Sequence, residues 1–305
     1  MEAEAGTHLP VLLDEVTFLL RPRHGGWVVD GTVGMGGHAE ALLERGGTET
    51  RLLGLDRDRE ALARARTRLA RFGDRVVLRH ADFRHLDGIA REIGVDAAQS
   101  VLLDLGVSSY QLAASERGFS FGTDAPLDMR FDPSEGPTAA RLLQRLSEAD
   151  LARIIFEYGE EPHARRIARE IVTRRHRTPL RTTVDLVAAV KTAVPRRAWP
   201  KGRHVATRTF QAIRMAVNEE VEALSEAVPA AAGLLAPGGR LGVISFHSGE
   251  DRIVKRAFRS LAEGPHLVLE PSPVTPSREE RRANRRCRSA KLRVLERIGE
   301  PHGAR

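Results

Sequence analysis

Short apolar runs alternate with stretches of helical spacing over the first 110 residues. The apolar runs that predict buried strands lie at residues 27–30, 51–56, 75–80 and 100–104. Between them, residues 38–44 and 58–72 carry apolar side chains at the three- and four-residue spacing of amphipathic helices. Parallel strands need crossover connections of this kind, so the pattern predicts a doubly wound, mostly parallel sheet with helices on both faces.

The alternation stops near residue 110 and resumes near residue 206. Residues 110–137 are rich in Gly, Pro, Ser and Asp, which is typical of an ordered loop, and residues 138–194 have helical spacing without a strand candidate. The later pattern predicts helices at 206–235 and 249–261, a turn at 237–239, a strand at 240–246 and a closing strand pair at 266–269 and 292–295. We therefore expect an α/β domain made of residues 1–110 and 206–305, with a loop and an all-helical domain inserted at residues 111–205.

The net charge of +7 is unevenly distributed along the chain. Residues 163–214 hold 14 Lys or Arg against two acidic residues, and residues 277–305 hold ten against four. The remainder has a net charge of −11. Such segregation favours a polyanionic partner, and a nucleic acid above all. The alternative is a solvated helix face in an arginine-rich protein, since only four of the 48 basic residues are lysine.

The composition, 41% hydrophobic and 29% charged, is that of an ordinary globular protein. No apolar stretch approaches the roughly 20 residues that span a bilayer, and the N-terminus lacks the apolar run of a signal peptide, so we expect a cytoplasmic protein. The single cysteine, Cys287, excludes an intramolecular disulfide and a cysteine-based zinc site, and no metal is expected. Cys287 lies in an arginine-rich tail, which is a poor place for a protected nucleophile, and this favours direct attack by a substrate atom.

Acidic residues end the predicted strands of the first domain. Asp30 ends the first strand and runs into a glycine-rich turn at residues 31–37 (GTVGMGG), which lets a ligand approach the backbone closely. Asp56 ends the second strand, where a carboxylate can accept both ribose hydroxyl groups of a nucleoside, and Asp104 ends the fourth. Because the carboxyl ends of parallel strands line the binding crevice of such a sheet, these acids predict one nucleoside site.

Asp30 distinguishes between the two nucleoside cofactors that use such a site. A carboxylate beside the turn would repel the pyrophosphate of NAD, whereas it suits the ammonium and sulfonium charges of S-adenosylmethionine. The spacing of Gly34 and Gly36 also differs from the dinucleotide fingerprint G-x-G-x-x-G. Asp82 and Phe83 follow the third strand, where a methyltransferase holds adenine, and Phe83 can stack on that ring. We therefore predict S-adenosylmethionine as the cofactor.

Several longer strings resemble the ribosomal small-subunit methyltransferase H family. They are HLPVLLDE at residues 8–15, DGTVGMGGH at 30–38, LLDLGVSS at 102–109, ERGFSF at 116–121, PLDMR at 126–130, ATRTFQA at 206–212, ISFHS at 244–248 and RSAKLR at 288–293. They extend over nearly the whole chain, and several are unusual strings rather than generic glycine patterns. The chain departs from the family pattern at Tyr110 and Arg285, where the family usually has Pro, and at Gly249, where it usually has Leu.

The resemblance implies a class I (Rossmann-like) methyltransferase that methylates the exocyclic N4 amine of a cytidine in the decoding region of 16S rRNA. S-Adenosylmethionine would be the methyl donor, and the RNA would lie within a small ribosomal subunit or a late precursor of it. The residues that the resemblance implies as cofactor contacts are Gly36, Gly37, His38, Asp56, Phe83, Asp104 and Gln111.

The exocyclic amine of cytosine is a poor nucleophile, because its lone pair is delocalised into the ring. A catalyst must hold the nitrogen in line with the methyl group and accept a hydrogen bond from the amine. The candidates for this acceptor are Asp104, Asp128 and His247, in that order. Each has a structural alternative: Asp104 as a cofactor ligand alone, Asp128 in an ion pair with Arg130, and His247 as a helix cap. Many amino-methyltransferases have an Asp/Asn/Ser-Pro-Pro-aromatic motif where this chain has Asp-Leu-Gly-Val, so the acceptor stays open.

A target base must leave its stack before an enzyme can methylate it, and positively charged residues would then hold the flanking phosphates. The arginines expected to bind RNA are Arg165, Arg166, Arg169, Arg174, Arg175, Arg177 and Arg208 in or near the insertion, and Arg281, Arg282, Arg285, Arg286 and Arg288 in the tail. Three alternatives remain: a DNA amino-methyltransferase, a non-catalytic nucleic-acid-binding protein and a dinucleotide-dependent oxidoreductase. The missing Asp-Pro-Pro-Tyr-type motif argues against the DNA methyltransferase. The intact acids around the turn argue against the non-catalytic protein, and Asp30 argues against the oxidoreductase.

Overall fold

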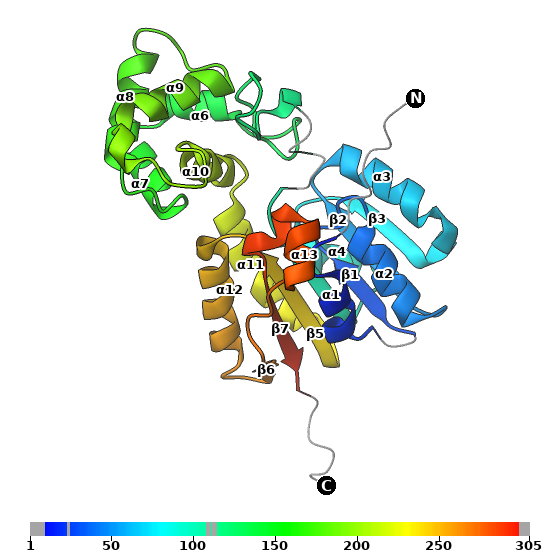
Figure 1. Cartoon of the computed structure of the whole chain (residues 1–305). Coiled ribbons are helices and arrows are strands. Elements are labelled where there is room, and N and C mark those ends of the chain that lie inside the picture. The colour runs from blue at the N-terminus through cyan, green and yellow to red at the C-terminus, as the bar shows by residue number, and fades with distance from the viewer. Residues whose placement is uncertain (1–9, 23–24, 108–110, 112–114, 299–305) are drawn as a thin grey trace. The chain divides into compact units, whose positions relative to one another are not determined.

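The computed structural model describes residues 10–22, 25–107, 111 and 115–298 (Figure 1). The chain forms two compact units. The first combines Met1–Gly106 with Glu222–Arg305, and the second is Val107–Val221. The insertion expected at residues 111–205 lies within this second unit, which also takes in the helix that follows it.

The first unit contains a seven-stranded sheet with the order β3-β2-β1-β4-β5-β7-β6. Its strands are β1 (Trp27–Asp30), β2 (Arg51–Asp56), β3 (Val76–His80), β4 (Ala98–Asp104), β5 (Leu235–Ser245), β6 (His266–Val268) and β7 (Lys291–Arg297). Strands β1 to β5 pair in parallel, whereas β7 runs antiparallel to both β5 and β6. The predicted doubly wound, mostly parallel sheet and its closing strand pair are confirmed.

Helices cover both faces of this sheet, as the two-residue alternation of strand side chains requires. In β1, Val28 packs into a cluster with α1 (Leu13–Leu20), α2 (Gly37–Gly46) and α3 (Arg59–Leu69). Its neighbour Val29 packs into the opposite cluster, with α4 (Leu86–Ile93), α11 (Glu220–Gly233) and α12 (Ser248–Leu261). Strand β1 is therefore buried on both sides, and its carboxyl end is the part that can face a ligand.

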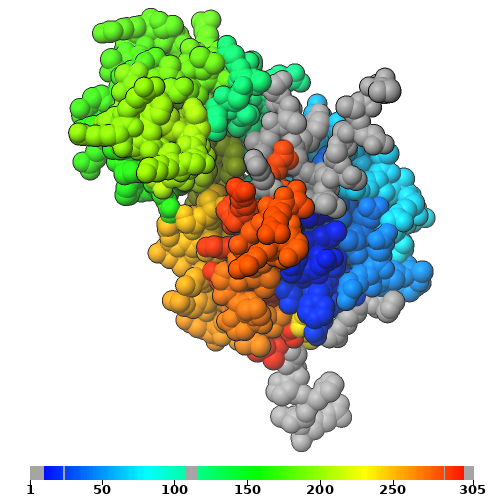
Figure 2. Space-filling view, viewed as in Figure 1, coloured from blue at the N-terminus to red at the C-terminus, as the bar shows by residue number. Residues whose placement is uncertain are grey.

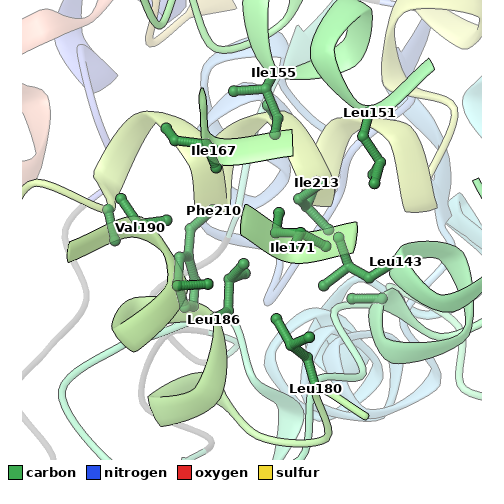
Figure 3. Close-up of a cluster of buried hydrophobic side chains, with 14 of the residues drawn as sticks. Leu143, Leu151, Ile155, Ile167, Ile171, Leu180, Leu186, Val190, Phe210 and Ile213 are labelled. Carbon is green, nitrogen blue, oxygen red and sulfur yellow. The ribbon is translucent and has the colours of Figure 1, made fainter. Parts of the chain in front are cut away.

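The second unit is built from helices around a separate apolar core. Its helices are α6 (Ala139–Arg145), α7 (Glu148–Glu157), α8 (Ala164–Arg175), α9 (Thr183–Ala193) and α10 (Thr207–Val217). Thr138, Ser147 and Thr182 cap three of them, each accepting a hydrogen bond from a backbone N–H of the first turn. Figure 3 shows apolar side chains from all five helices, such as Leu143, Leu186 and Phe210, directed toward one another. The predicted helical insertion is confirmed.

Two predicted elements are wrong in detail. The helix expected at residues 206–235 is broken into α10 and α11, because the Asn218 amide nitrogen donates to the carbonyls of Arg214 (2.9 Å) and Met129 (2.7 Å). Glu219 then takes a φ of 52°, which α-helical backbone does not allow. The turn expected at residues 237–239 lies inside β5, whose pairing with β4 shifts register there. Gly238, with a φ of 74°, accommodates the irregularity.

Candidate active site

Three aspartates meet at the carboxyl edge of the sheet. Asp30, Asp56 and Asp104 end β1, β2 and β4, which are neighbours in the order β2-β1-β4. The carboxyl group of Asp30 lies close enough to the other two for each pair to repel electrostatically. The sequence prediction that these acids share one site is therefore consistent with the register of the sheet.

The glycine-rich turn is fastened to these acids through its backbone. The Gly34 N–H donates to Asp56 Oδ2 at 2.8 Å, and the Asp58 N–H donates to the other oxygen, Oδ1, at 2.8 Å. Gly34 and Gly36 have φ values of 52° and 84°, so side chains at these positions would be strained. A Cβ at Gly37 would lie 2.5 Å from Pro10 Cγ, so the turn and the N-terminal segment pack directly on each other.

Burial makes the first two aspartates unusually weak acids. Asp30 is 1% exposed, and this burial together with the negative charge of Asp56 raises its pKa to about 7, although hydrogen bonds from Thr32 act in the opposite direction. Burial likewise raises the pKa of Asp56 to about 6. Each carboxylate is costly to keep ionised in the unliganded protein, and a bound cation would stabilise the ionised form.

His38 connects the N-terminal segment to Asp104. Its Nε2 lies 2.9 Å from the carbonyl oxygen of Val11, and a carbonyl accepts hydrogen bonds, so Nε2 carries the hydrogen. In the neutral ring Nδ1 is then the basic nitrogen, and it lies 3.6 Å from Asp104 Oδ2. His38 lies in the first turn of α2, where a helix cap would be the alternative to the cofactor contact that the family resemblance implies. The structure shows no side-chain cap on α2 and places the ring against the acid instead.

Asp104 has one carboxylate oxygen facing His38 and a second without a partner in the described part of the chain. Oδ1 is buried and has no hydrogen-bond partner among the residues that the structure describes. Burial, and then the negative charges of Asp30 and Glu250, raise the pKa of Asp104 well above its usual value. Its backbone N–H donates to Thr32 Oγ1 at 2.6 Å, which holds the end of β4 against the turn. A buried acceptor of this kind is suited to an N–H donor on a ligand.

Phe83 lies where the sequence placed it, after β3 and next to the turn. A Cβ at Gly31 would be 3.1 Å from Phe83 Cβ, so the two residues are in direct contact. Asp82, by contrast, is already engaged: its Oδ2 lies 3.2 Å from both Arg57 Nη1 and Arg84 Nε. Phe83 is partly buried against the core of the first unit, and Asp82 is held by two arginines of its own and a neighbouring loop.

His247 forms the cap of α12. Its Nδ1 accepts a hydrogen bond from the Glu250 N–H at 3.3 Å, and its Nε2 lies 2.9 Å from Glu250 Oε1. The other Glu250 oxygen accepts from the Phe246 N–H at 2.8 Å. The structural alternative for His247 is thus realised, and a catalytic role for it stays a prediction. A Cβ at Gly249 would lie 3.2 Å from His247 Nδ1, so the glycine gives this ring its room.

Glu250 is a site residue that sequence reasoning missed. It is 3% exposed and acts on the electrostatics of Asp104. The signal was available, because an acid three residues after His247 at the start of a predicted helix is the pattern of a capping box. The pattern does not indicate that Glu250 lies near Asp104 at the end of β4.

Two further candidates, Asp128 and Gln111, belong to the second unit. Arg130 holds both oxygens of Asp128, with Nε at 2.8 Å from Oδ1 and Nη2 at 2.7 Å from Oδ2. The ion pair expected as the structural alternative is therefore present. Gln111 is 5% exposed. The catalytic role of Asp128 and the cofactor contact of Gln111 stay predictions. Tyr110 lies outside the described residues.

The arginines of α8, together with Arg177 just after it, divide into two groups. Arg174 pairs with Glu170 at 2.6 Å, and Arg175 donates to the carbonyl oxygens of Leu143 and Leu146 at 2.6 and 2.7 Å, so both stabilise the helical unit itself. Arg165, Arg166 and Arg177 are exposed, as is Arg169, which pairs weakly with Glu148 at 3.4 Å; Arg208 on α10 is partly buried. A phosphate-binding role fits the exposed group and is unsuited to Arg174 and Arg175.

The basic C-terminal segment is attached to the N-terminal one. In α13 (Arg278–Ala283), Glu280 Oε1 accepts a hydrogen bond from the Leu12 N–H at 2.8 Å. Figure 2 shows this segment, in orange, lying against the dark-blue N-terminal helix. Arg281, Arg282, Arg286 and Arg288 are exposed there, whereas the side chain of Arg285 lies outside the described part. The tail is thus connected to the same segment whose Val11 carbonyl binds His38.

No helix in residues 10–22, 25–107, 111 and 115–298 is long and apolar enough to cross a membrane. Within the same ranges no group of three or more His, Cys, Asp or Glu side chains is placed to hold a metal ion.

Comparison with known proteins identifies the family. Residues 5–298 match the model of the MraW methylase family. The chain is 48% identical to Ribosomal RNA small subunit methyltransferase H of Heliobacterium mobile, over 95% of this chain and 99% of that protein. It is 50% identical to the protein of the same name from Geotalea uraniireducens, over 95% of this chain and 98% of that protein. On both grounds, the chain belongs to the MraW methylase family.

Proposed function

We propose that this protein transfers a methyl group from S-adenosylmethionine to the exocyclic N4 amine of a cytidine in the decoding region of small-subunit ribosomal RNA. Family membership supports methyl transfer, and the name of the relatives supports small-subunit ribosomal RNA as the substrate. The observation that carries the chemistry is the buried, unused Oδ1 of Asp104 beside the glycine turn. The protein acts in the cytoplasm, on a small subunit or a late precursor of it.

The residues at the turn fit the proposed cofactor. S-Adenosylmethionine supplies a methyl group activated by a sulfonium charge. Asp30 is buried with a pKa near 7, and an ammonium or sulfonium charge beside it would hold it in the ionised form. Asp56 uses one lone pair of each oxygen for the N–H groups of Gly34 and Asp58, which leaves lone pairs for ribose hydroxyl groups. Phe83 offers its ring to the adenine.

Asp104 and His38 would handle the proton of the amine. The cytosine N–H donates to Asp104 Oδ1, which orients the nitrogen lone pair and stabilises the positive charge that develops on nitrogen. When the N–H bond breaks, the proton passes to Asp104, and it can go on to His38 Nδ1 only when the two side chains close the 3.6 Å that separates Oδ2 from Nδ1. The Val11 carbonyl keeps the histidine in the tautomer that can accept it.

The nature of Cys287 supports the amine as the target rather than carbon 5. Methylation of carbon 5 of cytosine uses a cysteine nucleophile in its thiolate form. Cys287 is 0% exposed, and burial raises the pKa of its thiol, so it is neither accessible nor ionised at neutral pH. It packs with Val11, Leu12 and Ala290 in the core of the first unit.

RNA binding should fall steeply with salt. If the exposed arginines release counterions from several phosphates, raising the salt from about 50 to 200 mM should weaken binding by at least about 100-fold. Arg165→Ala should weaken binding and make the slope of log affinity against log salt shallower by about 0.7 to 0.9, as expected for one lost phosphate contact. Filter binding to ribosomal RNA at several salt concentrations measures both.

The control for this test is Arg91→Ala. Arg91 is an exposed arginine of α4 that pairs with Asp87, and its removal should leave the slope unchanged. Binding that is insensitive to salt, or an equal loss of slope in Arg91→Ala, would contradict the assignment of the exposed α8 arginines to phosphates.

Mass mapping of ribosomal RNA tests the proposed function in the cell. A strain that lacks the gene should miss one methyl group on a cytidine of the small-subunit RNA, and the wild-type gene should restore it. A complete set of small-subunit methyl groups in the deletion strain would exclude this substrate.

A further inference from the structure

The helical unit carries a partly exposed pair of stacked aromatic rings. These residues are distant in sequence from Asp30 and Asp56. Phe121 is 36% exposed, and its ring stacks on His204 with centroids 4.5 Å apart and planes 20° from parallel. Phe210, at the core of this unit, meets Phe121 edge-on at 5.5 Å. The Phe121–His204 pair is therefore supported from below by a buried ring while part of Phe121 stays open to solvent.

The loop that carries Phe121 is held firmly. The Met129 N–H donates to the Arg117 carbonyl at 3.0 Å, and Arg117 Nη2 donates to the carbonyls of Arg130 and Phe131 at 3.0 and 2.7 Å. Gly118 has a φ of 70°, and a Cβ there would lie 2.3 Å from the Pro126 carbonyl oxygen. These contacts join the Phe121 loop to the segment that contains Asp128. The exposed ring of Phe121 is therefore held on a well-fixed loop.

Positive charge without acidic neighbours surrounds His204, one member of this pair, in sequence. Residues 186–218 contain seven Lys or Arg and no Asp or Glu. Six of these cations make no ion pair within the described part of the chain, whereas Arg214 pairs with Glu220. The exposed ones among the six are Lys191, Arg196, Arg197, Lys201 and Arg203. Lys191 lies near His204, and burial together with this charge lowers the pKa of the imidazole. The ring is therefore neutral at pH 7, as a stacking partner should be.

We propose that the Phe121–His204 pair binds an unstacked base of single-stranded RNA, with the cations of residues 191–203 on its flanking phosphates. The identification of the polyanion as RNA rests on the proposed function. An aromatic face beside unpaired cations is the combination by which proteins bind single-stranded nucleic acid. The site differs from the arginines of α8, because it would bind a base as well as the backbone.

The test compares two labelled single strands of about ten nucleotides, an oligouridylate, which lacks the proposed target base, and an abasic strand with the same number of phosphates. Wild-type full-length protein should bind the oligouridylate more tightly, by about 5- to 150-fold for one stacked base. Phe121→Ala should lose that preference and bind both strands alike. Fluorescence anisotropy at a fixed salt concentration measures the affinities, and thermal melting confirms that each variant is folded.

Phe156→Ala is the matched control. Phe156 is 61% exposed on α7 of the same unit, beside Glu157 rather than a cluster of cations, and its removal should leave the preference intact. The proposal is overturned if Phe121→Ala keeps the wild-type preference for the strand that carries bases. It is also overturned if the substitution weakens the binding of both strands by the same factor, because a lost stacking contact would affect only the strand with bases. Methylation of small subunits by wild-type protein is measured in parallel. If it occurs while the stacking test fails, the base site is wrong and the proposed function stands.

Discussion

Replacing Asp104 by Asn is expected to lower kcat for methyl transfer by about 100- to 10,000-fold, the usual contribution of a positioned proton acceptor. The amide oxygen of Asn can still accept from the cytosine amine, and its nitrogen would take the place of Oδ2, 3.6 Å from His38 Nδ1. The substitution therefore keeps the shape of the side chain and an acceptor for the amine, and removes the charge and the capacity to take a proton. Single-turnover transfer to small subunits measures the effect on the chemical step.

A separate titration distinguishes chemistry from cofactor binding, because the family resemblance implies that Asp104 also contacts the cofactor. Calorimetry with S-adenosylmethionine should show an affinity loss much smaller than the loss in kcat. If Asp104→Asn transferred methyl groups at the wild-type rate, the unused Oδ1 would have another purpose. If all the loss were in cofactor affinity, Asp104 would be a cofactor ligand alone, and Asp128 would become the first candidate for the acceptor.

Replacing Asp30 by Asn should weaken S-adenosylmethionine binding at pH 7.5 by at least about tenfold, while making the unliganded protein more stable. Asn keeps the oxygen that accepts from the Thr32 N–H at 3.1 Å and removes the charge that burial disfavours. The folded-state pKa of about 7 exceeds the usual value of 3.8, so the folded protein holds this proton more tightly than the unfolded chain does. The stability that the protonated Asp30 contributes is complete below pH 4 and is lost as the pH rises to 7.

The expected gain in the free energy of unfolding at pH 7.5 is therefore at most about 4 kcal/mol. In the wild-type protein, cofactor affinity should rise from pH 5.5 to 7.5, because a cation needs the ionised carboxyl group. Asp30→Asn should lose most of that rise. Asp58→Asn, a nearby buried acid whose replacement can still cap α3, is the control and should keep it. A pH-independent affinity in the wild-type protein would contradict the role of Asp30.

The grouping of the three aspartates could be predicted from the sequence, because strand ends determine it. Asp30, Asp56 and Asp104 follow apolar runs, and a parallel sheet brings such ends together whatever else the chain does. The contact between His38 and Val11 has no comparable signal, since it joins residues 27 positions apart through the packing of the N-terminal segment on the turn. Glu250 was missed for the same reason: its local pattern identifies a cap, and tertiary packing places that cap near Asp104.

Charge patterns predicted a nucleic-acid partner but could not separate the arginines by function. Arg174 and Arg165 lie on one helix and look alike in sequence. The first is held by Glu170 one turn earlier, and the second has no such partner within reach on its helix. The break between α10 and α11 was hidden similarly, because Asn218 ends the helix through long-range hydrogen bonds to Met129 and Phe131. Helix propensity, which depends on neighbouring residues in the sequence, predicts neither the ion pairs of single arginines nor these long-range hydrogen bonds.

The most direct test of the account is the identity of the methylated nucleoside. Small subunits that lack the modification are incubated with purified wild-type protein and S-adenosylmethionine labelled in its methyl group, and the RNA is digested to nucleosides for chromatography and mass spectrometry. The account predicts that the label appears in N4-methylcytidine with wild-type protein and is nearly absent with Asp104→Asn. Label in 5-methylcytidine, in another nucleoside, or in no RNA at all would contradict it.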